Sequence, residues 1–171
     1  MSALKHWGLY KTRTDFPFTT IPAAHMNILA TNHTSFTVSN LDRSIAFFRD
    51  ALGFKVTSKA PRAQTVIEKV TGIPGAQVMI AYVRGPGHSI ELIEYSDPKD
   101  RVAVRPRPCD TGFSHIAYDV EDLDAVLTAA ARHQVLPVAE IVTVDQGPNK
   151  GGRVVYLRDA DGITFEFIQK P

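Results

Sequence analysis

The sequence lacks the features that mark several classes of protein. Its single cysteine, Cys109, excludes an intrachain disulfide and fits a reducing compartment, so we expect a cytoplasmic protein. No apolar run approaches the roughly 20 residues of a membrane-spanning helix, and residues 1–11 contain no continuous apolar segment of a signal peptide. The formal net charge is only +1. We therefore expect neither a membrane nor a nucleic acid among the partners.

The chain does contain one pattern twice. Residues 33–42 and residues 115–124 both fit H-x-x-[FY]-x-V-x-[ND]-L-D. Each copy is followed by a glycine turn and then by a predicted strand that carries a carboxylate, Glu91 in the first half and Glu166 in the second. An internal repeat of this kind determines the architecture, and here it predicts two related modules.

The spacing of the repeat supports a duplication. His33 and His115 are 82 residues apart, whereas Glu91 and Glu166 are 75 residues apart. The difference indicates an extra loop in the first half, near residues 60–75. One half alone would leave a curved sheet with an exposed face, so we expect the two halves to close around a shared cavity.

The residue pattern predicts the elements of the first half. Residues 33–38 alternate between an apolar face and a polar face, as in a half-buried strand. Apolar residues at helical spacing over 41–52 predict an amphipathic helix that ends at Gly53. Ser39 and Asn40 offer N-caps for this helix, and Ser39 with Asp42 resembles a capping box. We expect the other elements at 54–58, 77–83 and 89–95 (strands) and at 64–70 (a short helix).

The second half repeats this order, so each half reads βαβββ. Its predicted elements are a strand over 115–120, a helix over 123–130, and strands near 138–144, 152–158 and 163–169. We divide the chain into an N-terminal extended arm (1–30), a first module (31–95), a linker (96–111) and a second module (112–171). The arm is rich in aromatic residues, and we expect it to pack on its own domain or on a partner subunit.

Two histidines and two glutamates occupy matching positions in the two halves. His33 and His115 each begin a strand whose other face is apolar, so we expect both side chains on the concave side. Glu91 and Glu166 alternate with large apolar residues, where a carboxylate is costly to bury without a positive charge nearby. Taken singly, each residue is more often an ordinary strand residue, but four equivalent positions favour a ligand set.

These four side chains predict one divalent metal site shared by the two halves. Mixed imidazole and carboxylate ligation suits Zn, Ni, Co, Mn or Fe rather than Ca. Because each half supplies one histidine and one glutamate, deletion of either half should abolish metal binding altogether.

The repeated segments resemble the vicinal oxygen chelate superfamily, which includes glyoxalase I, bleomycin resistance proteins and extradiol dioxygenases. The resemblance covers about residues 31–170 and rests on residues 32–54, 90–95, 112–124 and 159–166. It implies an α+β fold in which tandem βαβββ modules form an eight-stranded U-shaped sheet around a metal-binding cavity. It also implies a homodimer. The set of potential ligands resembles that of glyoxalase I: His33, Glu91, His115 and Glu166.

By this resemblance we expect a metal-dependent lyase or isomerase of the glyoxalase type, acting on a small-molecule substrate with vicinal oxygens. The metal would acidify the C–H next to a carbonyl and stabilise an enediolate. Glu166 is the expected base, with Glu91 as its symmetric partner. Residues 92–95 depart from the glyoxalase I pattern and argue against a true lactoylglutathione lyase. Two alternatives are an Fe(II) extradiol-type dioxygenase and a non-catalytic small-molecule binding or resistance protein.

Several other polar residues are weaker candidates. Glu68 can act as a second acid or base, although its expected place on a short helix favours an ordinary exposed residue. Three linker arginines can bind an anionic group, although loop arginines are usually only solvated: Arg101, Arg105 and Arg107. Four further residues are candidates for lining the cavity: Tyr82, His88, Tyr95 and Asn149.

Overall fold

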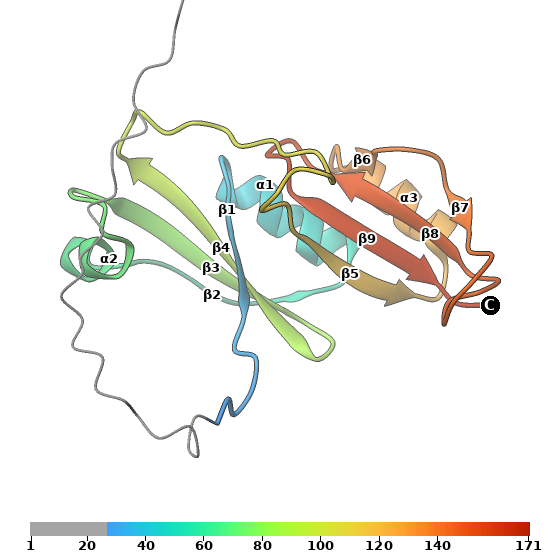
Figure 1. Cartoon of the computed structure of the whole chain (residues 1–171). Helices are drawn as coiled ribbons and strands as arrows, with labels where there is room; N and C mark the ends of the chain where they lie inside the picture. Colours follow the sequence, from blue (N-terminus) through green and yellow to red (C-terminus); the bar gives the residue numbers. More distant parts are fainter. Residues whose placement is uncertain (1–26) are drawn as a thin grey trace, which may run out of the picture. The chain divides into compact units, whose positions relative to one another are not determined.

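The computed structural model of the chain describes residues 27–171 (Figure 1). Its contacts separate Met1–Ala30 from one compact unit, Thr31–Pro171, and the following description concerns that unit. Residues 1–26 of the predicted arm lie outside the described residues. Within residues 27–171, no helix is long and apolar enough to cross a membrane.

The unit contains two βαβββ modules, as the repeat predicts. The first module consists of β1 (Thr34–Thr37), α1 (Leu41–Ala46), the π-helix η2 (Phe47–Ala51), β2 (Lys55–Pro61), α2 (Gln64–Thr71), β3 (Gln77–Gly85) and β4 (His88–Asp97). The second module consists of β5 (His115–Val120), α3 (Leu123–Ala131), β6 (Leu136–Pro137), β7 (Val142–Thr143), β8 (Arg153–Arg158) and β9 (Thr164–Gln169). The α+β class is confirmed.

The strands form two sheets rather than the single eight-stranded sheet that we expected within one chain. The first sheet has the order β1-β4-β3-β2, and the second has the order β5-β9-β8-β6, with β7 also pairing with β8. Strand β1 pairs in parallel with β4, and β5 pairs in parallel with β9. Strands β1 and β5 are each at the edge of their own sheet, and within residues 27–171 no strand of one module pairs with a strand of the other (Figure 1).

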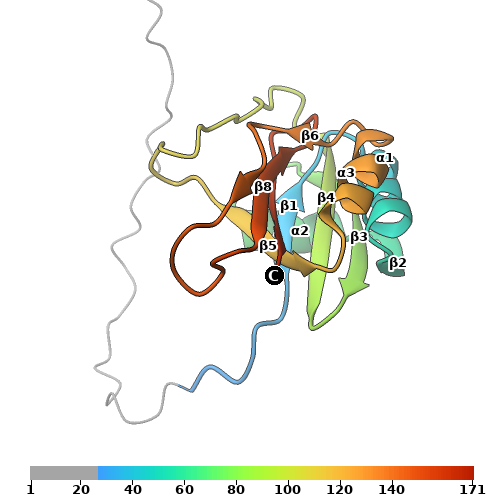
Figure 2. The same ribbon diagram turned by 90° about the vertical axis from the view of Figure 1, so that its right-hand side faces the viewer.

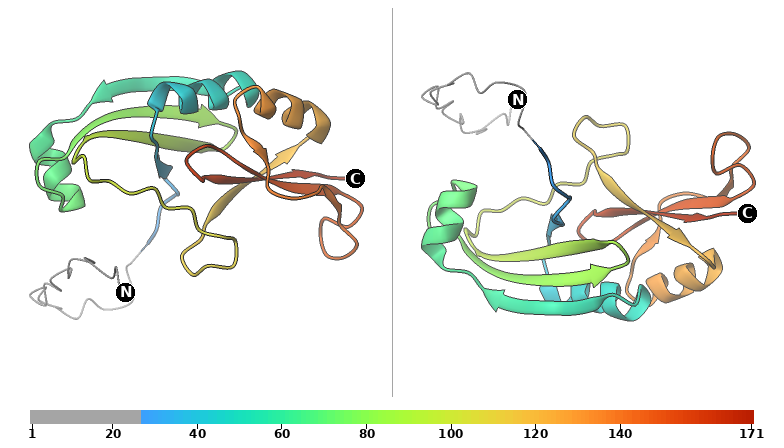
Figure 3. Two further views of the ribbon diagram at one scale, coloured as in Figure 1. Left: turned by 90° about the horizontal axis from the view of Figure 1, so that it is seen from above. Right: turned by 90° about the horizontal axis from the view of Figure 1, so that it is seen from below.

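The helices of both modules share one hydrophobic core. Figures 2 and 3 show α1 and α3 next to each other on the same side of the strands. The ring of Phe165 in β9 lies at the centre of this core, 5.2 Å from Phe47 and 5.7 Å from Phe48 between ring centroids. It also contacts Phe36 of β1, at 6.2 Å. Packing between the modules therefore uses the helix-covered face of each sheet.

The extra loop of the first half contains α2, which covers part of the opposite face of the first sheet. Ile67 of α2 packs with Val78 and Ile80 of β3. These two residues alternate with Ala81 and Val83, whose side chains belong to the main core. The second module has no counterpart of α2.

Two local predictions differ from the structure. The strand predicted near 138–144 is replaced by β6 and β7, each of two residues. Pro137 in β6 cannot donate a backbone hydrogen bond, which limits pairing there. Strand β4 continues to Asp97, so the linker begins at residue 98 rather than at residue 96.

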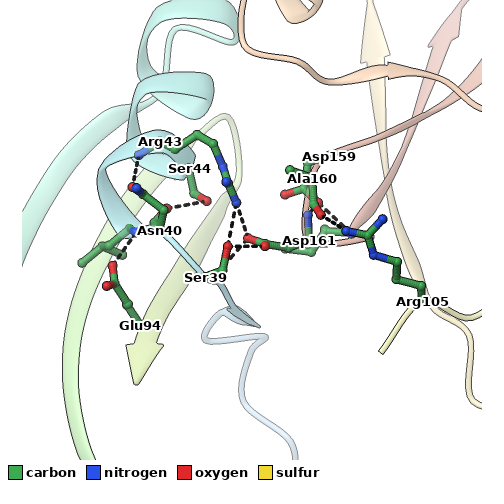
Figure 4. A network of polar contacts seen from close by, with 11 residues as sticks. Ser39, Asn40, Arg43, Ser44, Glu94, Arg105, Asp159, Ala160 and Asp161 are labelled. Atoms are coloured by element: carbon green, nitrogen blue, oxygen red, sulfur yellow. Dashed lines mark hydrogen bonds and ion pairs between the residues drawn. The ribbon is translucent and has the colours of Figure 1, made fainter. Parts of the chain in front are cut away.

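The N-terminus of α1 is also the place where the second module docks (Figure 4). Asn40 caps the helix by accepting a hydrogen bond from the Arg43 backbone N–H, at 2.9 Å. Ser39 does not form the predicted capping box. Its N–H and hydroxyl donate to Asp161 in the β8–β9 turn, at 3.0 and 2.5 Å. The Arg43 guanidinium donates to the same carboxylate at 2.7 Å.

Asp159 and Asp161 in this turn have different electrostatic surroundings. Burial raises the pKa of Asp159 above its ordinary value. Burial acts in the same direction on Asp161, but the hydrogen bonds from Ser39 and Arg43 together outweigh it, and the pKa of Asp161 lies below its ordinary value. Asp161 therefore joins the modules as a carboxylate.

We predict that Asp161→Asn destabilises the protein at neutral pH. The free energy of unfolding should fall by about 1 to 3 kcal/mol, because hydrogen bonds to a charged group are lost. A carboxyl group whose pKa is lower in the folded than in the unfolded state stabilises the folded protein at pH values above its unfolded-state pKa of about 4. This stabilisation disappears as the pH falls through its folded-state pKa.

Urea unfolding of the two proteins between about pH 7 and pH 3 measures this difference, which should narrow below about pH 4. Asp145→Asn in an exposed loop position is the matched control and should have little effect. If the difference in unfolding free energy between the wild type and Asp161→Asn stays constant with pH, Asp161 does not stabilise the junction as a carboxylate.

Candidate functional site

The first module brings His33 and Glu91 together. The Nε2 atom of His33, directly before β1, lies 3.3 Å from Oε2 of Glu91 in β4. Glu91 alternates with Ile90 and Leu92, which are fully buried in the core, so its side chain is forced to the other face of the sheet. The side chain of Glu91 is 12% exposed and that of His33 is 31% exposed. The pair therefore lies on an open face.

The second module repeats this arrangement. The Nε2 atom of His115, the first residue of β5, lies 3.0 Å from Oε2 of Glu166 in β9. Phe165 and Phe167 on either side of Glu166 are fully buried in the core. The side chains of His115 and Glu166 are 33% and 19% exposed. Both pairs thus have the same construction.

The structure does not bring the two pairs together. The pairs lie on different sheets, and within residues 27–171 no three histidine, cysteine, aspartate or glutamate side chains gather closely enough to hold one metal ion. Within residues 27–171 the four side chains that we expected around one shared metal ion therefore form two separate pairs. The reason is the common core, which turns the helix-covered faces of the sheets toward each other and leaves the polar faces apart.

A tyrosine stands beside each pair. Tyr82 of β3 lies directly across from Glu91, and its hydroxyl donates a hydrogen bond to Oε1 of Glu91. This hydrogen bond raises the pKa of Tyr82. Tyr156 of β8 lies across from Glu166 in the same way, but among residues 27–171 its hydroxyl makes no hydrogen bond to Glu166. Burial, followed by the Glu166 charge, raises the pKa of Tyr156.

Tyr82 is predicted from the sequence only as a candidate for lining the cavity, and Tyr156 is not among the predicted site residues. The signal was present in the repeat, because Tyr82 and Tyr156 are 74 residues apart, close to the spacing of the glutamates.

The histidines also differ in their neighbours. Nδ1 of His33 lies 2.6 Å from Oδ1 of Asn32, so Nδ1 carries the proton that this hydrogen bond requires. The corresponding position before His115 is Ser114, and no hydrogen bond to Nδ1 of His115 occurs in the described part of the chain. Instead, the His115 ring is flanked by Phe113 and Tyr156, at centroid distances of 6.0 and 5.0 Å.

The geometry of each pair fits a divalent metal. In each pair the imidazole Nε2 and a carboxylate oxygen, both atoms that bind divalent metals, lie side by side. Two ligands bound at about 2.1 Å to one metal are roughly 3.0 Å apart at octahedral angles and roughly 3.4 Å apart at tetrahedral angles. The observed 3.3 and 3.0 Å match this range. Each pair therefore has the spacing of two ligands that share one ion.

The other candidate residues have local structural roles. Glu68 accepts hydrogen bonds from Gln64 and from the Gly75 backbone, which lower its pKa and close the loop after α2. His88 bonds to Thr34 at 2.8 Å, and Tyr95 packs in the cluster beneath α2. Asn149 forms a backbone turn with Gly152.

The linker arginines bind neighbouring groups. Arg101 donates to the Pro98 carbonyl, Arg105 donates to the Ala160 carbonyl, and Arg107 pairs with Asp110. Cys109 is an exposed free thiol in the same segment. None of these contacts connects the linker with either histidine–glutamate pair.

Similar proteins include enzymes of two reaction types. A 2-epi-5-epi-valiolone epimerase from an Actinomyces species is 31% identical over 154 residues, which cover 84% of this chain and 80% of the relative. A lactoylglutathione lyase from Haemophilus influenzae is 30% identical over 144 residues, which cover 80% of this chain and 90% of the relative.

The fold is found in a solved structure as well. A glyoxalase family protein from Bacillus cereus superposes with a TM-score of 0.74 at 28% identity, covering 86% of this chain and 97% of that chain. The sequence profile of the Glyoxalase/Bleomycin resistance protein/Dioxygenase superfamily matches residues 30–167, which is most of the chain. The chain therefore belongs to this superfamily.

Proposed function

We propose that the protein is a metal-dependent lyase or isomerase that moves a proton next to a carbonyl in a small substrate with vicinal oxygens. In this proposal one divalent ion is held by His33 and Glu91 of one chain and by His115 and Glu166 of a second copy. The observation that carries the proposal is the pair of matching half-sites, each with a histidine nitrogen and a carboxylate oxygen 3.0 to 3.3 Å apart on an open face.

In the proposed dimer a second copy of the chain supplies the two remaining metal ligands. Within residues 27–171 each half-site offers two ligands, fewer than the three or four protein ligands of a catalytic metal site. A homodimer with two-fold symmetry places the first module of each chain against the second module of the other, and so completes two identical sites. Within residues 27–171, β1 and β5 each pair with a strand on one side only, and the proposed contact uses their other edges.

The roles of the residues follow from their contacts. When bound, the divalent ion acts as a Lewis acid toward adjacent substrate oxygens and makes the neighbouring C–H more acidic. Glu166 is the proposed base: its carboxylate takes this proton and returns it to the adjacent carbon or to the opposite face of the same carbon. Asn32 holds the His33 ring with Nε2 toward Glu91, and Tyr82 holds the carboxylate of Glu91, so these two residues would orient the ligands of the ion.

The contacts also favour Glu166 over Glu91 as the base. A carboxylate that takes a proton from the substrate and returns it has to change position, which a fixed hydrogen bond opposes. Glu91 has such a bond from Tyr82, whereas Glu166 receives none from Tyr156 among the described residues. The first module is therefore the anchoring half and the second module is the reacting half.

A mixing experiment tests whether the site lies between chains. Variant A carries His33→Ala and Glu91→Gln, and variant B carries His115→Ala and Glu166→Gln. Each variant alone should bind no stoichiometric metal. After co-refolding in equal amounts, half of the dimers contain both variants and each of these has one intact site, so binding should recover to about a quarter of the wild-type value.

Metal content by elemental analysis after dialysis against Zn²⁺, and separately against Mn²⁺, measures the recovery. A mixture that stays empty while the wild type binds would contradict a site shared between two copies.

A second prediction concerns the two tyrosines. Tyr82→Phe should weaken metal binding by about tenfold, because loss of a partner that orients a ligand typically costs 10- to 100-fold in affinity. Tyr156→Phe is the matched control at the equivalent position and should change the affinity less than about twofold. Competition with a chromophoric chelator measures both dissociation constants. Equal losses in the two variants would contradict the division between an anchoring and a reacting half.

The base is tested by Glu166→Gln. We expect deuterium incorporation from D₂O to slow by at least about 100-fold, the usual contribution of general base catalysis. A panel of α-hydroxy-carbonyl, thioester and hemithioacetal substrates covers the candidate reactions, with exchange followed by NMR. Glu140→Gln, at an exposed position, is the control and should exchange at the wild-type rate. Full exchange by a metal-loaded Glu166→Gln protein would exclude this role.

A further inference from the structure

The polar face of the first sheet carries a positively charged side chain, Arg84, beside the half-site. Arg84 lies two residues beyond Tyr82 in β3, about 7 Å further along the strand, and so on the same face as Tyr82 and Glu91. Val83 between them is fully buried in the core. The next position, Gly85, lies over the ring of Phe54 on the core side, where a Cβ atom would come within 2.3 Å of the ring. This alternation fixes the direction of Arg84 toward the half-site face.

The strand register places Arg84 and His33 at the same level across the first sheet, on either side of Ser89. Arg84 is paired with Ser89 of β4, and Ser89 is adjacent to Ile90, which is paired with Thr34. His33 directly precedes Thr34. Neighbouring strands are about 4.8 Å apart, so the Arg84 and His33 backbones are separated by roughly two strand spacings, a distance that an arginine side chain can largely span.

The positive charge of Arg84 is free of acidic partners in the described part of the chain. Its side chain is exposed, and among residues 27–171 it forms neither an ion pair nor a hydrogen bond. Lys55 of β2 lies directly across from it, is also exposed, and adds a second positive charge to the row. An open hollow of about 350 Å³ is lined by Arg84 together with Asn32 and Ser89.

The repeat offers an internal comparison. Arg158 of β8 is the counterpart of Arg84, since each lies two residues after the tyrosine that faces the glutamate. Arg158 is half-buried, and its guanidinium donates to the Thr164 hydroxyl at 3.2 Å and to the Pro106 carbonyl at 3.3 Å. The second module thus uses this arginine to hold the linker, whereas the first module leaves the equivalent arginine exposed at the half-site.

We propose that Arg84 forms an anion subsite, so that the substrate carries a carboxylate or phosphate group a few bonds away from its vicinal oxygens. The guanidinium presents a planar set of donors that matches both groups, and Ser89 and Asn32 line the same hollow. This inference rests on the proposed function, because the metal site fixes which end of the substrate lies at His33 and Glu91. The anion subsite adds to the proposed function the requirement that the substrate carries a negative charge.

Ligands that differ only in their tails test the subsite. Acetohydroxamate offers two adjacent oxygens and a neutral tail. Glutarate monohydroxamate and a phosphonate-tailed hydroxamate of the same length add an anion at the far end. Binding to Mn²⁺-loaded wild type, Arg84→Gln and Arg132→Gln is measured by calorimetry, with Arg132 as an exposed control in the second module.

In the wild type and in Arg132→Gln we expect at least one anionic tail to increase affinity by about tenfold over acetohydroxamate, as expected for a charge-assisted hydrogen bond. Arg84→Gln should remove this gain and leave acetohydroxamate binding unchanged. The tail with the larger gain distinguishes a carboxylate from a phosphate substrate. If neither anionic tail increases the affinity, or if the increase persists in Arg84→Gln, Arg84 does not form an anion subsite, whereas the proposed metal site is unaffected by this result.

Failure of the proposed function has a different signature. If no hydroxamate binds because no metal is held, inorganic phosphate is titrated into the metal-free protein and followed by amide NMR shifts. Shifts at Asn32, Arg84 and Ser89 that disappear in Arg84→Gln would support the subsite without the metal. If phosphate causes no shifts at these residues, the subsite is excluded together with the proposed function.

Discussion

The packing of Phe165 and Phe167 on either side of Glu166 is the constraint from which the arrangement of the candidate site follows. Both phenylalanines are fully buried; Phe165 contacts aromatic residues of the first module, whereas Phe167 packs against Tyr118 of its own module. Because side chains alternate along a strand, burying these rings forces Glu166 to the opposite face. Ile90 and Leu92 have the same effect on Glu91. The core that joins the modules thereby directs both carboxylates away from it, and the half-sites are separated for the same reason that the chain is compact.

The polar junction at the N-terminus of α1 fixes this arrangement. Asp161 binds Ser39 and Arg43 at once, so the β8–β9 turn of the second module is tied to the first helix of the first module (Figure 4). A low pKa keeps Asp161 ionised in this position. The helix-covered faces are occupied inside the chain, and within residues 27–171 the polar face of each sheet and the edge strands β1 and β5 are the surfaces that the proposed contact with a second copy uses. The proposed site between chains uses the surfaces that folding leaves open.

Much of the fold could be predicted because the repeat and the side-chain alternation are local properties of the sequence. The faces of residues 33–38 and the helix over 64–70 depend only on the periodicity of short segments, and the repeat predicts that the histidines and glutamates occupy equivalent positions in the two halves. Whether the two pairs meet within one chain depends on how the modules dock, and that depends on tertiary contacts such as Ser39 with Asp161, 122 residues apart. Ser39 read alone predicts a cap, because the sequence pattern does not contain its distant partner.

The differences between the two halves are the part of the structure that bears most directly on mechanism. Duplication places a histidine, a glutamate, a tyrosine and an arginine at equivalent positions, yet among residues 27–171 only the first histidine–glutamate pair is held by further side chains, those of Asn32 and Tyr82. The second half uses its arginine, Arg158, to secure the linker. The proposed proton transfer uses this difference, because within residues 27–171 Glu166 is the carboxylate that receives no hydrogen bond from its neighbouring tyrosine, whereas Glu91 receives one from Tyr82.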